Sequence, residues 1–437
     1  MRLSWWLPLS LAFALAGCDE VIVDTDPRED ATADAAPRQI PVAMAVPMAV
    51  RTHAQAAPQA EPVPVRSPAA ATPAAVTRTT GGNGPRRRIV EPDPPFRSTP
   101  VATFNEPWAM TFLPDGRLLV TEKGGALRLL NPANGQAGTI SGVPAVAYGG
   151  QGGLGDVILH PLYASNRRIY LSHVERSGSN YGAVVVRARL TLDGAGGGHL
   201  DSIQRIWEQV PKVSGQGHFS HRLAFDAAGK LWITSGDRQK FDPAQDMSTN
   251  LGKILRLNDD GSIPADNPFA SQGGVAAQVW SLGHRNPLGI SFDAEGRMWS
   301  HEMGPEGGDE LNLVLRGLNY GWPLVSNGSH YGGAPIPDHD TRPELEAPKA
   351  WWTPVIAPAG MVIYSGNLFP TFRGDAFIGG LASQALIRVR FNGTSAAEYR
   401  RYPMGRRIRE IEQGPDGAIW LLEDGGGGRL LKLTPPA

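Results

Sequence analysis

A tight turn followed by a short apolar strand recurs along the chain from about residue 100 onward. Four clear copies read LPDGRLLVTEKGG, FDAAGKLWITSGD, FDAEGRMWSHEMG and GPDGAIWLLEDGGG, and their turn glycines are Gly116, Gly229, Gly296 and Gly417. Two weaker copies, SNRRIYLSH and FRGDAFIGGL, surround Ile169 and Phe377. Six such units of about 40 to 80 residues are typical of the four-stranded blades of a propeller. The sequence therefore predicts an all-β fold, a six-bladed β-propeller over residues 100–437.

Polar or acidic side chains lie just beyond the repeated strands, and they include Glu122, Asp237, Glu302 and Asp424. In a propeller, equivalent strand ends surround the central channel on one face. We therefore expect residues that are far apart in the sequence to converge on that face.

The N-terminus has the features of an export signal. Arg2 precedes an apolar run that ends in Leu-Ala-Gly-Cys at Cys18, the only cysteine of the chain. This ending resembles a bacterial lipoprotein box, in which the cysteine is lipidated and becomes the first residue of the mature protein. We expect residues 1–18 to be a lipoprotein signal, and the protein to be exported and anchored to a membrane, facing the periplasm. An ordinary signal peptide or an incidental cysteine is the alternative.

Residues 19–99 differ in composition from the rest of the chain. This stretch is rich in Ala, Pro, Thr and Val without periodicity, as in AQAAPQAEPVPVRSPAAATPAAV. Such a segment buries too little apolar surface to offset the chain entropy lost on folding. It is predicted to be a disordered Ala/Pro-rich linker between the anchor and the propeller, with a small additional domain as the alternative.

Charge and cysteine content exclude several classes of function. The chain has 41 Lys and Arg against 42 Asp and Glu, which argues against a nucleic-acid partner because phosphate binding needs a basic surface. A single cysteine allows neither an internal disulfide nor a cysteine-based zinc site.

Two histidines lie just before one of the repeated strands, in QGHFSHRLAFD. Asp237 follows the same strand, nineteen residues after His218. A histidine held by a carboxylate has a fixed tautomer and a basic second nitrogen, which suits a general base. Surface or packing roles for His218 and His221 are the alternative.

Two arginine groups could bind a small polyanion. Arg285 and Asn286 lie in SLGHRNPLG, while Arg407 and Arg409 are two residues apart in GRRIRE and would share one face of a strand. Arginine presents a planar fork that matches carboxylates. Gln151 lies among glycines in AYGGQGGLGD, where backbone can approach a ligand closely. Solvated surface charge is the alternative for each arginine group.

Residues 301–323, HEMGPEGGDELNLVLRGLNYGWP, combine backbone kinks with oxygen ligands. Calcium takes six to eight oxygens, many of them backbone carbonyls. Turns at Gly304-Pro305 and Asn319-Tyr320-Gly321 could point carbonyls inward, and Asp309 and Glu310 supply carboxylates. A calcium site is one interpretation, and a glycine-rich turn with solvated acids is the other.

Taken in order, QGGLGD, GHFSHRLAFD with SGDR, LGHRNPLG, EMGPEGGDELNLV with NYGWP, APAGMVIY and RRIREIEQGPDGAIWLL resemble the soluble sugar dehydrogenases that depend on pyrroloquinoline quinone (PQQ). The branch in question is that of the aldose sugar or glucose/sorbosone dehydrogenases, and the resemblance covers about residues 101–435. It implies a six-bladed propeller that oxidises aldose sugars at the anomeric carbon to the lactone, with PQQ and calcium as cofactors and an unidentified electron acceptor.

The resemblance also implies roles for individual residues. His218 would be the general base, and Asp237 would orient it. The expected cofactor-binding residues are Gln151, Arg285, Asn286, Tyr331, Ala382, Ser383, Arg407, Arg409 and Asp424. The expected calcium ligands are the carbonyls of Gly304 and Pro305, together with Glu310 and Tyr320.

The chain also departs from the family pattern. The loop 379–384 lacks a lysine that relatives can carry, Met303 precedes Gly304, and His221 replaces a small residue. Trp351 and Trp352 could stack on sugars or lie in the core. Two other readings remain open, a metal-dependent lactonase-like propeller hydrolase and a non-catalytic binding propeller, because propellers host many functions.

Overall fold

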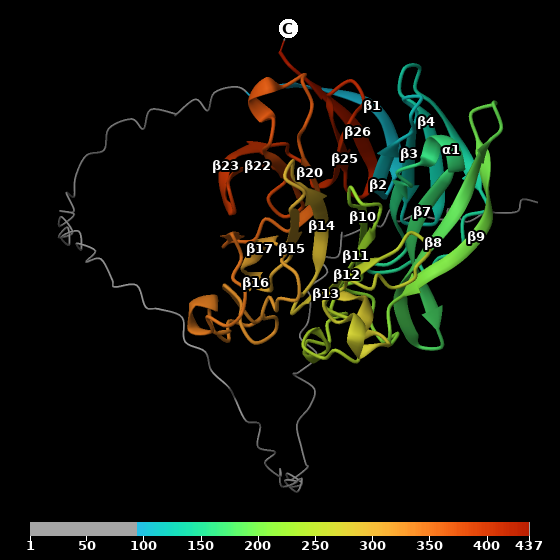
Figure 1. Ribbon diagram of the computed structural model, residues 1–437. Coiled ribbons are helices and arrows are strands. Elements are labelled where there is room, and N and C mark those ends of the chain that lie inside the picture. The colour runs from blue at the N-terminus through green and yellow to red at the C-terminus, as the bar shows by residue number, and fades with distance from the viewer. Residues whose placement is uncertain (1–93, 437) are drawn as a thin grey trace, which may run out of the picture. The chain divides into compact units, whose positions relative to one another are not determined.

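The computed structural model describes residues 94–436, and every structural statement below concerns that part of the chain. The predicted signal, Cys18 and residues 19–93 of the predicted linker lie outside the described residues. Strands dominate the described part (Figure 1).

Antiparallel groups of four strands follow one another along the chain. In the first five groups the chain order matches the spatial order, whereas the last group is completed by the first strand of the described chain. The first two groups form one eight-stranded sheet, because β5 and β9 pair in parallel at Ile140–Gly198 and Ser141–His199. The groups are β2 (Pro107–Phe112), β3 (Leu118–Glu122), β4 (Ala126–Asn131) and β5 (Gln136–Ser141); β6 (Leu154–Leu159), β7 (Arg168–Ser177), β8 (Asn180–Leu192) and β9 (Gly198–Glu208); β10 (Ser220–Phe225), β11 (Leu231–Ser235), β12 (Lys253–Leu257) and β13 (Val279–Leu282); β14 (Pro287–Phe292), β15 (Met298–Glu302), β17 (Asp309–Leu313) and β19 (Ala350–Trp352); β20 (Pro358–Ile363), β21 (Ala376–Gly380), β22 (Ala385–Asn392) and β23 (Ser395–Pro403); β24 (Ile408–Gln413), β25 (Ile419–Glu423), β26 (Gly426–Thr434) and β1 (Arg97–Asn105).

The remaining elements are short. They are a two-stranded ribbon and single turns of helix: β16 (Glu306–Gly307) with β18 (Gly328–Ser329), α1 (Tyr163–Asn166), η2 (Asp242–Ala244), η3 (Ala270–Gln272), η4 (Ala276–Gln278), η5 (His339–Thr341) and η6 (Pro370–Phe372). Within residues 94–436, no helix has the length and apolar character needed to cross a membrane.

The predicted repeats are all strands, and each is the second strand of its group: β3, β7, β11, β15, β21 and β25. The clear copies keep their turn glycine at positive φ, for example 72° at Gly229 and 77° at Gly296, a conformation that favours glycine. In two of the turns the first aspartate also accepts an indole N–H from the strand, with Trp232 on Asp226 and Trp299 on Asp293, both at 2.9 Å.

The first strands of successive groups contact one another in a closed order: β2 with β6, then β10, β14, β20 and β24, and β24 again with β2. Apolar cores fill the spaces between neighbouring sheets. One example packs Tyr170 and Val185 against Leu223 and Ile233, and all four are buried. The fold is therefore all-β and propeller-like, with its strand ends brought together around the first strands.

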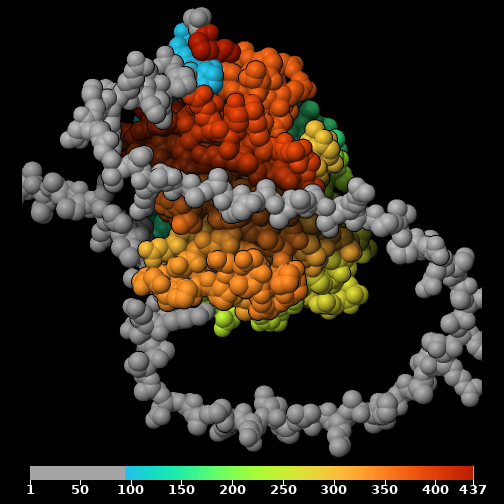
Figure 2. All heavy atoms as spheres, turned by 90° about the vertical axis from the view of Figure 1, so that its left-hand side faces the viewer, coloured from blue at the N-terminus to red at the C-terminus, as the bar shows by residue number. Residues whose placement is uncertain are grey.

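The two ends of the described chain meet in one sheet. β1 pairs antiparallel with β26, from Arg97–Thr434 to Asn105–Gly426. Figures 1 and 2 show this first strand, in blue and cyan, beside the dark red C-terminal segment. Residues 97–99, which the sequence assigned to the end of the linker, belong to this strand.

The first strands also carry a buried charged cluster. Arg222 on β10 forms an ion pair with Glu410 on β24, lies 3.8 Å from Asp156 on β6, and stacks on Trp108 at 4.0 Å. Burial raises the pKa of Glu410 to about 7, although Arg222 acts in the opposite direction; the charge of Asp156 adds to the increase. Glu412 interacts with Glu410 and Asp156 as well, and the charge of Arg222 favours its ionised form. One guanidinium therefore offsets the charge of several carboxylates.

This cluster predicts a pH dependence of stability. The pKa of Glu410 is higher in the folded chain than its usual 4.5, so its contribution is full below about pH 4.5 and is lost as the pH rises through about 7. Urea unfolding of the wild type and Glu410→Gln should therefore show a stability difference that changes by up to about 3 kcal/mol between these pH values. Glu295→Gln on an exposed turn is the control. A difference independent of pH would contradict this assignment.

Candidate active site

A buried histidine–aspartate pair lies between the third and fourth groups of strands. His218, before β10, has Nδ1 2.7 Å from Asp237 Oδ1, and their side chains are 4% and 0% exposed. Burial alone would raise the pKa of Asp237, but the charge and hydrogen bond of His218 and the charge of Arg285 outweigh it and hold the pKa below its usual value. An ionised Asp237 only accepts hydrogen bonds, so the His218 proton lies on Nδ1 and Nε2 is the basic ring nitrogen.

Further donors fix the Asp237 carboxylate. The backbone N–H of Gln239 donates to Oδ1 at 2.8 Å, and the indole N–H of Trp322 donates to Oδ2 at 2.7 Å. The backbone N–H of Asp237 in turn donates to Arg285 O at 2.8 Å. These contacts connect the strand end after β11 to two segments of the fourth group of strands.

Gln151 reaches the same pair from the second group of strands. Its Oε1 accepts the backbone N–H of His218 at 2.8 Å, and its own N–H donates to Gln216 O at 2.8 Å. Gly150 has φ 52°, and a Cβ there would lie 2.7 Å from Gln216 O. The glycines around Gln151 thus allow close approach to the histidine segment.

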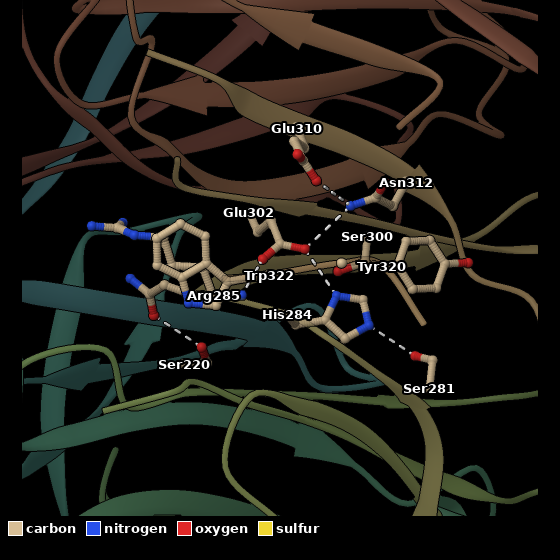
Figure 3. Close-up of polar contacts among 12 residues, drawn as sticks. Ser220, Ser281, His284, Arg285, Ser300, Glu302, Glu310, Asn312, Tyr320 and Trp322 are labelled. Atoms are coloured by element: carbon tan, nitrogen blue, oxygen red, sulfur yellow. Dashed lines mark hydrogen bonds and ion pairs between the residues drawn. The ribbon is translucent and has the colours of Figure 1, made fainter. Parts of the chain in front are cut away.

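Glu302, at the end of β15, organises the segment that carries Arg285. It is 4% exposed, and its Oε2 accepts the backbone N–H of Arg285 at 2.5 Å. Its Oε1 lies 2.8 Å from His284 Nδ1 and accepts from Asn312 Nδ2 at 3.2 Å (Figure 3). The sequence marked Glu302 as a strand-end acid but assigned it no role; here it holds the backbone from which Arg285 projects.

The Arg285 side chain contacts one of the carbonyls that were expected to bind calcium, that of Gly304. Its Nη1 donates to Gly304 O at 2.8 Å and to Met303 O at 3.2 Å. The guanidinium carbon lies 5.4 Å from the Trp322 ring, and Nη2 is 3.5 Å from the Tyr331 hydroxyl. Arg285, Gly304 and Tyr331, which the sequence placed in one site, are therefore brought together.

A small cavity lies beside these groups, and its walls include Arg285, Glu302, Gly304, Pro305, Glu310, Tyr320 and Trp322. Its volume, measured to the centre of a water-sized sphere, is about 10 Å³, the room that one water molecule needs. Within residues 94–436, no three His, Cys, Asp or Glu side chains gather in a way that could hold a metal ion.

Glu310 and Tyr320 reach this cavity in different ways. Asn312 Nδ2 links Glu310 Oε2 to Glu302, and His339 Nε2 lies 3.1 Å from Glu310 Oε1. Burial raises the pKa of Glu310, and repulsion from Glu302 adds to this, against the hydrogen bond to His339. The Tyr320 hydroxyl donates to Leu313 O at 2.5 Å, so a bound cation would meet Tyr320 through its backbone carbonyl.

Asp309, suggested by the sequence as a source of carboxylate ligands, instead holds backbone. It accepts the N–H groups of Gly304, Ile356 and Ala357 at 2.7 to 2.9 Å. The amides of Ala382 and Ser383 donate to Ile356 O at 3.1 and 3.2 Å, which places the loop 381–384 against this segment. The buried Ser383 hydroxyl has no hydrogen-bond partner within the described part of the chain.

The second arginine group shares one carboxylate. Arg407 Nε and Arg409 Nε donate to the two oxygens of Asp424, each at 2.7 Å. Burial would raise the pKa of Asp424, but the two guanidinium groups outweigh it and lower the pKa to about 2. Asp424 therefore aligns the two arginines side by side.

Lys123 is a cation that sequence reasoning missed. It follows β3, interacts electrostatically with Arg407 and Arg409, and donates from Nζ to Gly150 O at 3.1 Å. Gly150 precedes Gln151, so contacts continue from Lys123 to His218. The signal that could have identified Lys123 is its position directly after a repeated strand.

His221 lies outside the site, whereas Asn286 lies next to Arg285 in the sequence and is buried. His221 is buried, stacks on Trp108 with ring centroids 5.0 Å apart, and lies 2.7 Å from Ser172 Oγ, so it belongs to the core. Burial lowers the pKa of His221 to about 3, which keeps it neutral. Asn286 is fully buried and accepts the Ser220 hydroxyl at 2.9 Å, while its Nδ2 lies 4.0 Å from Met303 Sδ.

The two adjacent tryptophans have different environments. Trp352 is buried and donates to Glu398 at 2.7 Å, whereas Trp351 is 57% exposed. Trp352 thus belongs to the core.

Comparison with known proteins identifies relatives over nearly the whole described part. The sequence model of the family described as Glucose / Sorbosone dehydrogenase matches residues 104–432. The aldose sugar dehydrogenase YliI of Escherichia coli (strain K12) is 39% identical over 341 residues, covering 76% of this chain and 91% of the relative. The solved apo-form of the soluble aldose sugar dehydrogenase of Escherichia coli superposes with a TM-score of 0.73 at 38% identity, over 78% of this chain and all of that one.

A second solved structure is that of the PQQ-bound aldose sugar dehydrogenase of Streptomyces coelicolor. It superposes with a TM-score of 0.65 at 28% identity, covering 78% of this chain and 99% of that chain. The family match spans well over half of the sequence and agrees with the arrangement of strands described above. The chain therefore belongs to the glucose/sorbosone dehydrogenase family.

Proposed function

We propose that this protein oxidises aldose sugars at the anomeric carbon to the lactone, with PQQ and calcium as cofactors and an unidentified final electron acceptor. The observation that carries the proposal is the buried His218–Asp237 pair beside Arg285 and an oxygen-lined cavity. Relatives named aldose sugar dehydrogenase and a PQQ-bound neighbour support it.

The cations near the pair fit an anionic quinone. PQQ carries carboxylates, and Arg407, Arg409 and Lys123 gather three positive charges around the single carboxylate of Asp424. Planar guanidinium groups bind carboxylates through paired hydrogen bonds. Gln151, Asn286, Tyr331, Ala382 and Ser383 complete the proposed set, and the buried Ser383 hydroxyl supplies a polar atom for a ligand.

The donor set around the cavity fits a hard cation. We assign calcium to the carbonyls of Gly304 and Pro305, the Glu310 carboxylate and the Tyr320 carbonyl, which are all oxygen ligands. A cation at Gly304 O would replace the hydrogen bond from Arg285. When bound, PQQ supplies a two-electron acceptor and calcium supplies a Lewis acid.

The protein's own part in the chemistry is to orient the sugar and take its proton. His218 Nε2 accepts the proton of the anomeric hydroxyl, because the Nδ1 proton is directed to Asp237. Asp237 stays ionised and stabilises the imidazolium that forms. Burial of both groups excludes water from the proton transfer.

Reconstitution tests the proposal. We expect the purified protein to reduce an artificial dye only when aldose, PQQ and calcium are all present, and a chelator to abolish the reaction. Dye reduction and quinone binding by absorbance titration are measured together. Lactone hydrolysis without quinone would favour the hydrolase, and quinone binding without turnover would favour a binding propeller.

A change at His218 should separate proton transfer from cofactor binding. We expect His218→Ala to lower kcat by about 10²- to 10⁴-fold, the usual contribution of a general base. Quinone affinity should stay within about threefold, because the cations that hold the carboxylates are unchanged. Wild-type turnover in a reconstituted variant would contradict the role of His218 as base.

We also propose that the fold is a six-bladed propeller on a lipid-anchored linker. The six successive groups of four strands support the blade count. The export-type N-terminus and Cys18 support an exported lipoprotein facing the periplasm.

Cys18→Ser tests the anchor. If Cys18 is lipidated, the wild type should fractionate with membranes and incorporate labelled fatty acid, because acyl chains hold a protein at the bilayer. The variant should lose both properties while its dye reduction is unchanged. Equal membrane association of the two proteins would contradict lipid anchoring.

A further inference from the structure

Trp322, in the Asn-Tyr-Gly-Trp-Pro stretch, lies between the candidate base and the candidate cation cavity. Its side chain is buried, and its ring packs against Ala244 and Ile336 and lies 5.5 Å from the Phe241 ring. Its backbone N–H donates to Gly283 O at 2.9 Å, and its carbonyl accepts from Gln245 at 2.6 Å. The indole is therefore held firmly in one orientation.

The indole contacts both parts of the site. Its N–H donates to Asp237 Oδ2 at 2.7 Å, the oxygen that His218 does not use. With donors on both oxygens, the carboxylate plane cannot rotate without losing a hydrogen bond. The same ring lines the cavity with Gly304 and Glu310, and it lies 5.4 Å from the Arg285 guanidinium carbon (Figure 3).

We propose that Trp322 is a positioning residue for the reaction: its N–H fixes the Asp237 carboxylate, which aims the His218 ring at the substrate. The kinetic test of this proposal rests on the proposed function, whereas the hydrogen bond between Trp322 and Asp237 does not. Trp322 acts on the base through Asp237, and its ring also forms part of the cavity wall. Removing the indole N–H would thus change the orientation of the His218 ring without removing a contact to the substrate.

The chain offers a matched control. Trp232 is also buried and donates its indole N–H to a turn carboxylate, Asp226, at 2.9 Å. This bond lies in the turn before β11, whereas Asp237 lies beyond the other end of that strand. Trp322→Phe and Trp232→Phe therefore each remove one indole–carboxylate hydrogen bond, and only the first lies in the site.

In the reconstituted enzyme, Trp322→Phe should lower kcat about 10- to 100-fold, the effect of losing a hydrogen bond to a charged group. The KM for sugar and the affinities for PQQ and calcium should stay within about threefold. Trp232→Phe should lower the melting temperature but keep wild-type kcat. Unchanged kcat in Trp322→Phe, or a parallel loss of cofactor affinity, would overturn the positioning role.

A second measurement needs no cofactor. The Nδ1 proton of His218 is observed by NMR in the protein without cofactors and assigned by its absence in His218→Asn. Its resonance should shift or broaden in Trp322→Phe and stay in place in Trp232→Phe. This measurement distinguishes the positioning role from the proposed function, because it can be made even if the wild type does not bind PQQ.

If Trp322→Phe fails to fold, 3-benzothienylalanine at position 322 keeps the ring shape and removes only the N–H. We expect it to reproduce the kinetic and NMR changes. A wild-type signal and wild-type kcat with this isostere would overturn the proposal.

Discussion

The buried carboxylate of Asp237 is the contact on which the candidate site depends. A buried charge is costly unless it is fully hydrogen-bonded, and here His218, Gln239 and Trp322 together supply three donors. The backbone N–H of Asp237 also donates to Arg285 O. Moving this one residue would therefore displace the base and the nearest guanidinium segment together.

Buried carboxylates at other strand ends are hydrogen-bonded by different partners. Glu302 uses an imidazole, an amide and a backbone N–H, whereas Asp424 uses two guanidinium groups. The repeated strand supplies the same geometry each time, while the residue that follows it sets the local chemistry. The scaffold is thus separable from the site that it carries.

The sequence predicted the features that depend on local pattern. Alternating apolar residues identified the second strand of every group, in most groups after a turn glycine, because both signals act within about ten residues. The spacing of His218 and Asp237 followed from the same repeat, since they flank one pair of adjacent strands. The pairing of Arg97 to Thr99 with β26, at the other end of the described chain, leaves no such local signal.

What the sequence could not supply were contacts between distant segments. Trp322 meets Asp237 across 85 positions, and Lys123 meets Gly150 across 27, so no local pattern marks either contact. Residue type alone also left roles open: Asp309 binds backbone N–H groups, and His221 packs in the core. Both depend on which neighbours the fold brings against them.

The arrangement around Arg285 shows how one side chain can organise a turn of the backbone. Carbonyl oxygens that converge on a cavity repel one another unless a positive group satisfies them. Here the guanidinium donates to Gly304 O and Met303 O and so supplies that charge from within the chain. Because Glu302, at the end of β15, fixes the Arg285 backbone, the strand end determines where the guanidinium meets these carbonyls. The acid that follows the repeated strand thus sets the geometry of the neighbouring turn through a single arginine.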